Sequence, residues 1–246
     1  MKPYELIGSM GCGSAIVEMA LALARVPHTL TDIPYLKPGP QRDRLLRINP
    51  LGQVPTMVTP DGEVLTESAA MMLHLHDVAP RAGLAPPSDD PARPRFLNLL
   101  IRLVAAVYPT FTYGDDPPQW TGPGPAAEHL RARVHARRAD IWQEIERYAG
   151  APHMLGARFS ALDLYLAVMT RWRPGPAWFA EYCPALSPWR APRPRSRKWP
   201  ACWRGISRRR RSRAQPRPPR AALALRVSRS AMYTPLPAMK SAPTKA

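Results

Sequence analysis

The sequence predicts an α/β domain followed by an all-α helical bundle domain and a disordered C-terminal tail. Three observations support this. Short strands alternate with helices through residue 79. Residues 82–90 form a proline-rich connector, after which apolar residues recur at helical spacing. From residue 187 onward arginine and proline dominate, which predicts disorder. With 246 residues and a hydrophobic fraction of 45%, the chain is long enough for two small domains.

The first domain is predicted to run strand, helix, strand, helix, two strands, helix. Apolar residues repeat at helical spacing from Ile16 to Leu23, and the last two strands are joined by a turn at Asp61-Gly62. The predicted strands cover residues 4–7, 29–33, 56–58 and 64–65, and the predicted helices cover residues 15–24, 41–48 and 68–79.

The second domain is predicted from three helical segments and an aromatic loop. Residues 94–107 carry one apolar stripe, and residues 126–148 form a long amphipathic helix. Between them, residues 108–117 are predicted to be a loop whose aromatic side chains either receive an apolar ligand or fill the interdomain core. At the third helix, Ser160 and Asp163 are spaced for a capping box, so Asp163 is interpreted as structural.

The run Asn49-Pro-Leu-Gly-Gln-Val-Pro55, followed by Glu67-Ser68, predicts a peptide-binding site. Proline lacks an N–H and accepts a cis bond, so the Val54-Pro55 step can direct Val54's backbone groups toward an extended ligand. Glu67 and Ser68 stand where a helix begins, which suits a carboxylate and an ammonium. A γ-glutamyl peptide carries both groups.

These motifs resemble those of the glutathione S-transferase family. The resemblance implies a thioredoxin-like domain over residues 1–81, a helical domain over 91–186, and a basic tail over 187–246 that departs from the family. It further implies glutathione as co-substrate, a cis Pro55, a homodimer and a cytoplasmic detoxification enzyme that conjugates glutathione to a small electrophile. The residues implied to bind glutathione are Gln53, Val54, Pro55, Glu67 and Ser68.

The turn between the first strand and the first helix holds the candidates for activating the thiol. Members of the family use Tyr, Ser or Cys there, and this turn offers Ser9, Cys12 and Ser14. A helix N-terminus favours a thiolate, and a serine hydroxyl can hydrogen-bond one. Counting back from the helix favours Cys12 first and Ser14 second, while Cys12 as an inert packed residue stays the alternative.

The cysteine, histidine and hydropathy patterns predict that disulfides, metal sites and membrane spans are absent. Three cysteines make no disulfide framework, and Cys183, Cys202 and the six histidines show no metal-ligand spacing, so no metal is expected. No signal peptide and no membrane span are expected, so the natural compartment is a reducing cytoplasm.

The net charge of +17 comes from the tail. Residues 1–186 hold 18 basic and 18 acidic residues, and the other 17 basic residues follow without a single acid. Three readings stay open: out-of-frame translation, an inert solvated tail, or a nucleic-acid-binding arm with Trp189, Trp199 and Trp203. Two functional alternatives accompany the transferase: a non-catalytic binding module with that arm, and a glutathione-dependent reductase through Cys12. The tail is also expected to leave apolar surface of the helix at residues 159–169 uncovered.

Overall fold

The computed structural model describes residues 2–187, which lie within one compact unit. Met1 and residues 188–246 are outside this description. The predicted disordered tail therefore falls, apart from Ser187, outside the described residues, and its three readings stay predictions.

A four-stranded sheet in the order β2-β1-β3-β4 organises the first half of the chain. Strands β1 (Tyr4–Gly8) and β2 (His28–Asp32) pair in parallel, with Leu6 opposite Leu30. Strand β3 (Thr56–Val58) runs antiparallel to β1, and β4 (Val64–Leu65) runs antiparallel to β3. Because β1 and β2 are parallel, the loops that follow them lie at the same edge of the sheet.

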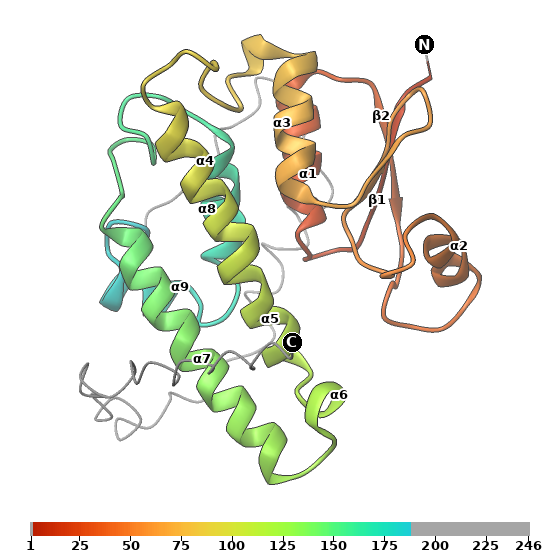
Figure 1. Cartoon of the computed structure of the whole chain (residues 1–246), viewed down its shortest axis with the longest axis vertical. Helices are drawn as coiled ribbons and strands as arrows, with labels where there is room; N and C mark the ends of the chain where they lie inside the picture. Colours follow the sequence, from red (N-terminus) through yellow and green to blue (C-terminus); the bar gives the residue numbers. More distant parts are fainter. Residues whose placement is uncertain (1, 188–246) are drawn as a thin grey trace, which may run out of the picture. The chain divides into compact units, whose positions relative to one another are not determined.

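Helices cover both faces of this sheet. On β1, Leu6 joins the main core with α1 (Ser14–Ala24) and α3 (Ser68–Val78), whereas Ile7 joins a smaller cluster with Leu45 of α2 (Pro40–Ile48). Successive strand residues point to opposite faces, so α2 lies across the sheet from α1 and α3 (Figure 1). This is the thioredoxin-like arrangement, and the predicted order of strands and helices is confirmed.

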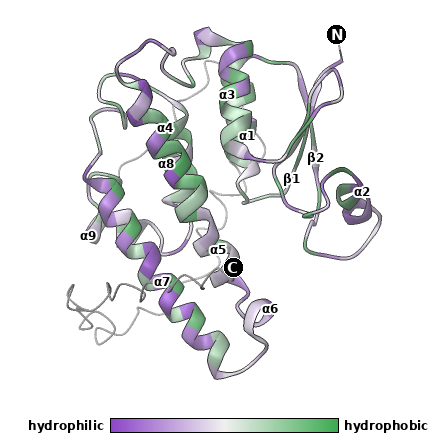
Figure 2. Ribbon diagram, viewed as in Figure 1, coloured by the Kyte–Doolittle hydropathy of each residue, from purple (hydrophilic) through white to green (hydrophobic). Residues whose placement is uncertain are grey.

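The second half of the chain is helical. It follows a short 3-10 turn (Pro80–Ala82). Its long helices carry both apolar and polar residues (Figure 2), as expected for helices with one buried and one exposed side. The main core collects the apolar side of α4 together with α8. The segments are α4 (Arg93–Arg102), a π-helical stretch (Leu103–Val107), α5 (Tyr108–Asp115), α6 (Pro118–Thr121), α7 (Pro125–Glu146), α8 (Ala161–Met169) and α9 (Pro176–Tyr182).

The prediction of a loop over residues 108–117 is wrong, because most of this segment is helix α5. Pro109 has no N–H to donate to the preceding turn, and the π-helical stretch Leu103–Val107 lies directly before α5. Gly114 lets α7 approach closely: a Cβ there would lie 3.1 Å from Nη2 of Arg138 and 3.2 Å from Val134.

The continuous helical segment Arg93–Asp115 is long and apolar enough to cross a membrane by length and composition alone, with a mean hydropathy of 1.3. The expectation that no segment approaches a span is therefore wrong by that criterion. Core helices of soluble proteins meet the same criterion, and five apolar residues of this segment are buried in the main core: Phe96, Leu99, Leu100, Leu103 and Val107.

Helix α8 is the centre of the helical domain. All its residues are buried, and Phe179, Cys183 and Leu186 belong to the same core. The expectation of uncovered apolar surface on this helix is thus wrong, because the segment at α9 shares its core.

The predicted capping box at the start of α8 is present, with the Ser160 N–H donating to Asp163 Oδ2 at 2.7 Å. The other oxygen of Asp163 accepts the N–H of Met154 at 3.1 Å and lies 3.4 Å from His153 Nδ1. One buried carboxylate therefore fixes both the helix start and the preceding loop.

Candidate functional site

The turn between β1 and α1 is held together by Ser9 and Ser14. The Ser14 hydroxyl accepts the Ser9 N–H and donates to the Ser9 carbonyl, both at 3.1 Å, and the Cys12 N–H donates to the same carbonyl at 3.1 Å. Ser14 is buried, whereas Cys12 is half-buried. The hydroxyl of Ser14 is thus engaged inside the turn, and the side chain of Cys12 is the more accessible of the two.

Tyr35 contacts Cys12 from the loop after β2. Its hydroxyl hydrogen-bonds the Cys12 side chain, and burial first, then Cys12, raises the pKa of Tyr35. The Tyr35 ring packs on the cluster formed by Ile7, Ile33 and Leu45. A phenol with a raised pKa stays protonated at neutral pH, so Tyr35 can donate to the sulfur.

Tyr108 reaches the same turn from α5 in the helical domain. A Cβ added to Gly13 would lie 2.4 Å from the Tyr108 hydroxyl oxygen, so only glycine leaves room there. This hydroxyl is buried and has no hydrogen-bond partner among residues 2–187. Burial, followed by the nearby Tyr165 and Cys12, raises the pKa of Tyr108 well above its ordinary value.

The loop before β3 presents Gln53, Val54 and Pro55. Buried Asn49 shapes this loop: its Nδ2 donates to the Gln53 carbonyl at 3.2 Å and to Thr56 Oγ1 at 3.0 Å. The Val54-Pro55 bond is cis, as predicted. Within the described residues no hydrogen bond uses the backbone groups of Val54. They are therefore available to an extended ligand.

Glu67 and Ser68 stand at the start of α3. Glu67 is the N-cap residue and is exposed, while Ser68 is buried. The hydroxyl of Tyr165, from α8, donates to Ser68 Oγ at 2.7 Å. Ser68 keeps its own proton for a ligand acceptor at the helix N-terminus. Burial raises the pKa of Tyr165, so it remains a donor at neutral pH.

Aromatic contacts connect the two halves of the site. Tyr165 meets Tyr108 edge-on with 6.4 Å between ring centroids, and Tyr108 meets Trp172 at 5.8 Å. Trp172 in turn meets Phe111 at 5.2 Å. These contacts favour the core-filling reading for Phe111. Tyr113 is 43% exposed and packs on Trp120.

A buried arginine fixes this aromatic wall. The Arg138 guanidinium lies 3.9 Å from the centroid of Phe111 and donates through Nε to Thr110 Oγ1 at 2.9 Å and through Nη2 to the Thr110 carbonyl. Burial lowers the pKa of Arg138 to about 10, which still leaves it charged at neutral pH. α7 thereby holds α5 and Tyr108 in place.

Sequence reasoning missed the roles of Tyr35, Tyr108 and Tyr165. For Tyr35 a signal was available, because loops following parallel neighbouring strands meet at one sheet edge and Cys12 follows the other strand. Tyr108 lies in the segment whose aromatic side chains were expected to receive a ligand or fill the interdomain core, but its contact with Gly13 could not be foreseen. For Tyr165 no signal was available, since its contact with Ser68 depends on how α8 packs against the sheet domain.

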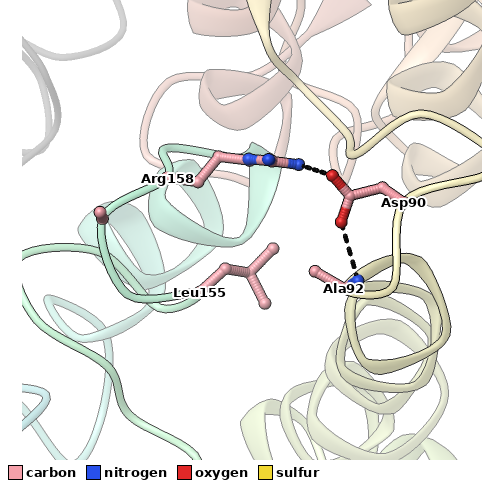
Figure 3. Close-up of a pocket in the computed structure, with 5 residues that line it drawn as sticks. Asp90, Ala92, Leu155 and Arg158 are labelled. Carbon is pink, nitrogen blue, oxygen red and sulfur yellow. Dashed lines mark hydrogen bonds and ion pairs between the residues drawn. The ribbon is translucent and has the colours of Figure 1, made fainter.

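A cavity of about 450 Å³ lies elsewhere, between the segment before α4 and the loop before α8 (Figure 3). Asp90 pairs with Arg158 and accepts the Ala92 N–H at 2.8 Å, and hydrogen bonding from Arg158 lowers the pKa of Asp90. These groups satisfy one another, and none belongs to the predicted site. Residues 2–187 contain no group of three or more His, Cys, Asp or Glu that could hold a metal ion.

Comparison with known proteins gives consistent matches. Residues 14–78 match the family model "Glutathione S-transferase, N-terminal domain". The chain is 36% identical over 185 residues to the uncharacterized GST-like protein YncG of Escherichia coli K12, covering 74% of this chain and 88% of YncG. It is 28% identical to glutathione S-transferase GstA of Escherichia coli O157:H7, covering 68% and 81% of the two chains.

Solved structures agree. A glutathione transferase homologue from Sulfitobacter with bound glutathione is 26% identical with a TM-score of 0.66, over 76% of this chain and 90% of that one. A sphingomonad glutathione S-transferase complexed with glutathione is 26% identical with a TM-score of 0.63, over 85% and 100%. With this fold, this site and these relatives, the chain belongs to the glutathione S-transferase family.

Proposed function

We propose that the protein is a glutathione transferase that conjugates glutathione to small electrophiles at the turn between β1 and α1. The observation that carries the proposal is the position of Cys12: it precedes α1, and Tyr35 hydrogen-bonds its side chain while Tyr108 packs on the adjacent Gly13. Two hydroxyls at a helix N-terminus suit a sulfur anion.

Glutathione is placed by groups on the same domain. The unpaired backbone groups of Val54 suit the peptide part, and the start of α3, with Ser68 and the exposed Glu67, suits the γ-glutamyl end. The exposed Gln53 is a further contact. Relatives crystallised with glutathione support this assignment.

In the conjugation step, the glutathione thiolate attacks the electrophilic carbon, a C–S bond forms, and the leaving group departs with its electron pair. The protein lowers the cost of keeping the thiolate charged beside the turn. We place Cys12 first in this role and Ser14 second, because the Ser14 hydroxyl already donates and accepts within the turn.

A thermal melt with and without glutathione tests binding. A ligand present at about 100 times its Kd stabilises the folded state by roughly 2.7 kcal/mol, which raises the midpoint of a domain this size by roughly 5–10 °C. A cooperative melt that ignores 10 mM glutathione contradicts the proposal and favours the binding module. DNA affinity lost on removing residues 187–246 would then identify that module.

Conjugation is tested with a chlorodinitroarene probe. Cys12→Ser should lower the enzymatic rate, whereas Ser14→Ala should disturb the turn and so lower stability. If Cys12→Ser conjugates at the normal rate, Cys12 is not the residue that supports the thiolate.

The hydrogen bond between Tyr35 and Cys12 also favours a second activity, glutathione-dependent disulfide reduction. Here the Cys12 thiolate attacks a mixed disulfide, forms a disulfide with glutathione and releases the other thiolate. A second glutathione then attacks, leaving as oxidised glutathione and regenerating the Cys12 thiolate. Reduction of a glutathionylated peptide that is lost in Cys12→Ser identifies this activity.

The proposal includes a cellular setting. We place the enzyme in the cytoplasm as a homodimer that detoxifies electrophiles, on the basis of its family membership. Sedimentation of the purified chain tests the dimer.

A further inference from the structure

Cys12 is approached by hydroxyls from two different elements. Tyr35, in the loop after β2, hydrogen-bonds its side chain. Tyr108, from α5, places its hydroxyl against Gly13 and remains without a partner within residues 2–187. The Tyr35 hydroxyl therefore has a hydrogen-bond partner in Cys12, whereas the Tyr108 hydroxyl has none within residues 2–187.

The Tyr35 hydroxyl is held by the backbone around it. The Tyr35 N–H donates to the Ile33 carbonyl at 2.9 Å, and its carbonyl accepts a hydrogen bond from the Arg42 guanidinium. Its ring lies on the cluster formed by Ile7, Ile33 and Leu45. The hydroxyl therefore approaches Cys12 from a fixed loop.

Charged groups of both signs surround the turn. The Asp32 carboxylate, at the end of β2, accepts the Met10 N–H at 3.0 Å. Asp115, at the end of α5, acts electrostatically on Tyr35. Arg173 lies 3.9 Å from Asp115 and partly offsets it. The groups here that favour a sulfur anion are the hydroxyls of Tyr35 and Tyr108, the N-terminus of α1 and the Arg42 guanidinium on the Tyr35 carbonyl.

We propose that Tyr35 is a positioning residue that sets the reactive form of Cys12 by donating a hydrogen bond to its sulfur. The inference rests on the proposed function, and specifically on its second activity, disulfide reduction, in which Cys12 is the reacting thiol. Tyr108 is then the donor available to a second sulfur, that of a bound thiol, because its hydroxyl has no hydrogen-bond partner within residues 2–187.

The experiment follows alkylation of the full-length chain by iodoacetamide between pH 5 and pH 10, without glutathione. Peptide mass spectrometry reports Cys12, Cys183 and Cys202 separately. Removing one hydrogen bond to a charged group should move the midpoint of the Cys12 profile in Tyr35→Phe upward by about one pH unit. Tyr113→Phe is the matched control, because Tyr113 is exposed and packs on Trp120.

Cys183 serves as an internal check of folding. It is buried, and burial raises its pKa to about 12, so slow Cys183 labelling shows that a variant is folded. An unchanged Cys12 midpoint in folded Tyr35→Phe overturns the inference. So does a wild-type midpoint at or above about 8.5, the value of an unperturbed thiol, which needs no variant.

The two proposals fail separately. A melt of the wild-type chain that ignores glutathione overturns the proposed function but leaves the Cys12 profile measurable. A normal glutathione shift combined with an unperturbed Cys12 profile overturns only the role of Tyr35.

Discussion

At the scale of single residues, the site depends on hydroxyls whose burial keeps them protonated. Tyr35, Tyr108 and Tyr165 all have raised pKa values because of burial, and they come from three elements. Cys12 was a candidate from the sequence because a cysteine just before a helix can hold a stabilised thiolate. The position of Tyr35 after a parallel strand and the aromatic segment that holds Tyr108 were visible in the sequence, whereas the contact of Tyr165 with Ser68 was not.

Tyr108→Phe should leave the melting midpoint unchanged or raise it. The variant removes a buried hydroxyl that has no partner within residues 2–187 and keeps the ring contacts with Tyr165 and Trp172. Differential scanning calorimetry checks this. A clear drop in the midpoint would show that the hydroxyl supports the fold. Tyr165→Phe provides the contrast, since it breaks the bond to Ser68 and should lower the midpoint.

At the scale of elements, strands and most helices were predictable because apolar periodicity and turn residues mark them. The four strands agree with prediction to within a residue at each end. Helix α5 was missed because Pro109 and the aromatic residues read as a loop. The short α6 and α9 were not predicted either. The close contact of the α1 turn with α5 depends on Gly13, which the sequence analysis did not single out.

Gly13→Ala should displace α5 from this turn. The backbone of Gly13 is already helical, with φ −62° and ψ −19°, so alanine brings no conformational strain and its effect is steric. We expect a lower melting midpoint and a loss of conjugation.

The double variant Gly13→Ala/Tyr108→Phe is the control. It removes the oxygen that an added Cβ would meet at 2.4 Å, although the ring carbons at 3.1 and 3.3 Å remain close. Partial recovery of the midpoint is expected, and equal losses in the single and double variants would contradict the steric explanation.

Asp163→Ala should destabilise the protein by roughly 2–4 kcal/mol. Its carboxylate accepts backbone N–H groups from Ser160 and Met154 in a buried site, so the variant leaves two buried donors without their acceptor. The expected loss of stability is therefore larger than the ~1 kcal/mol of an ordinary helix cap. Urea unfolding measures the loss. Asp140→Ala, at an exposed position on α7, is the matched control and should change stability by less than about 0.5 kcal/mol. Equal effects would show that the capping box does not stabilise α8.

At the scale of the whole molecule, a buried histidine, His76, and a half-buried one, His135, make stability depend on pH. Burial is the main cause that lowers the pKa of His76 and of His135, and Arg93 and Arg138 respectively add to it. Well above about pH 6.5 both are neutral in the folded and in the unfolded state. Below it, the unfolded chain takes up these protons before the folded chain does, so stability falls as the pH falls.

His135→Gln should therefore reduce the loss of stability between pH 7.5 and pH 5.5. Urea midpoints at the two pH values measure that loss, and His129→Gln, at an exposed position on the same helix, should behave like the wild type. An equal loss in all three proteins would mean that protonation of carboxylates, rather than of His135, causes the loss of stability at low pH.

The bond from Tyr165 to Ser68 has a consequence for biosynthesis. Tyr165 lies in the first turns of a helix whose start is fixed by Asp163, and it is synthesised 97 residues after Ser68. A nascent chain that stopped before α8 would carry every predicted glutathione-binding residue and still lack the donor that orients Ser68. Capture of glutathione would then report that the helical domain has been completed, and binding by truncated chains would be weaker even where their sheet is intact.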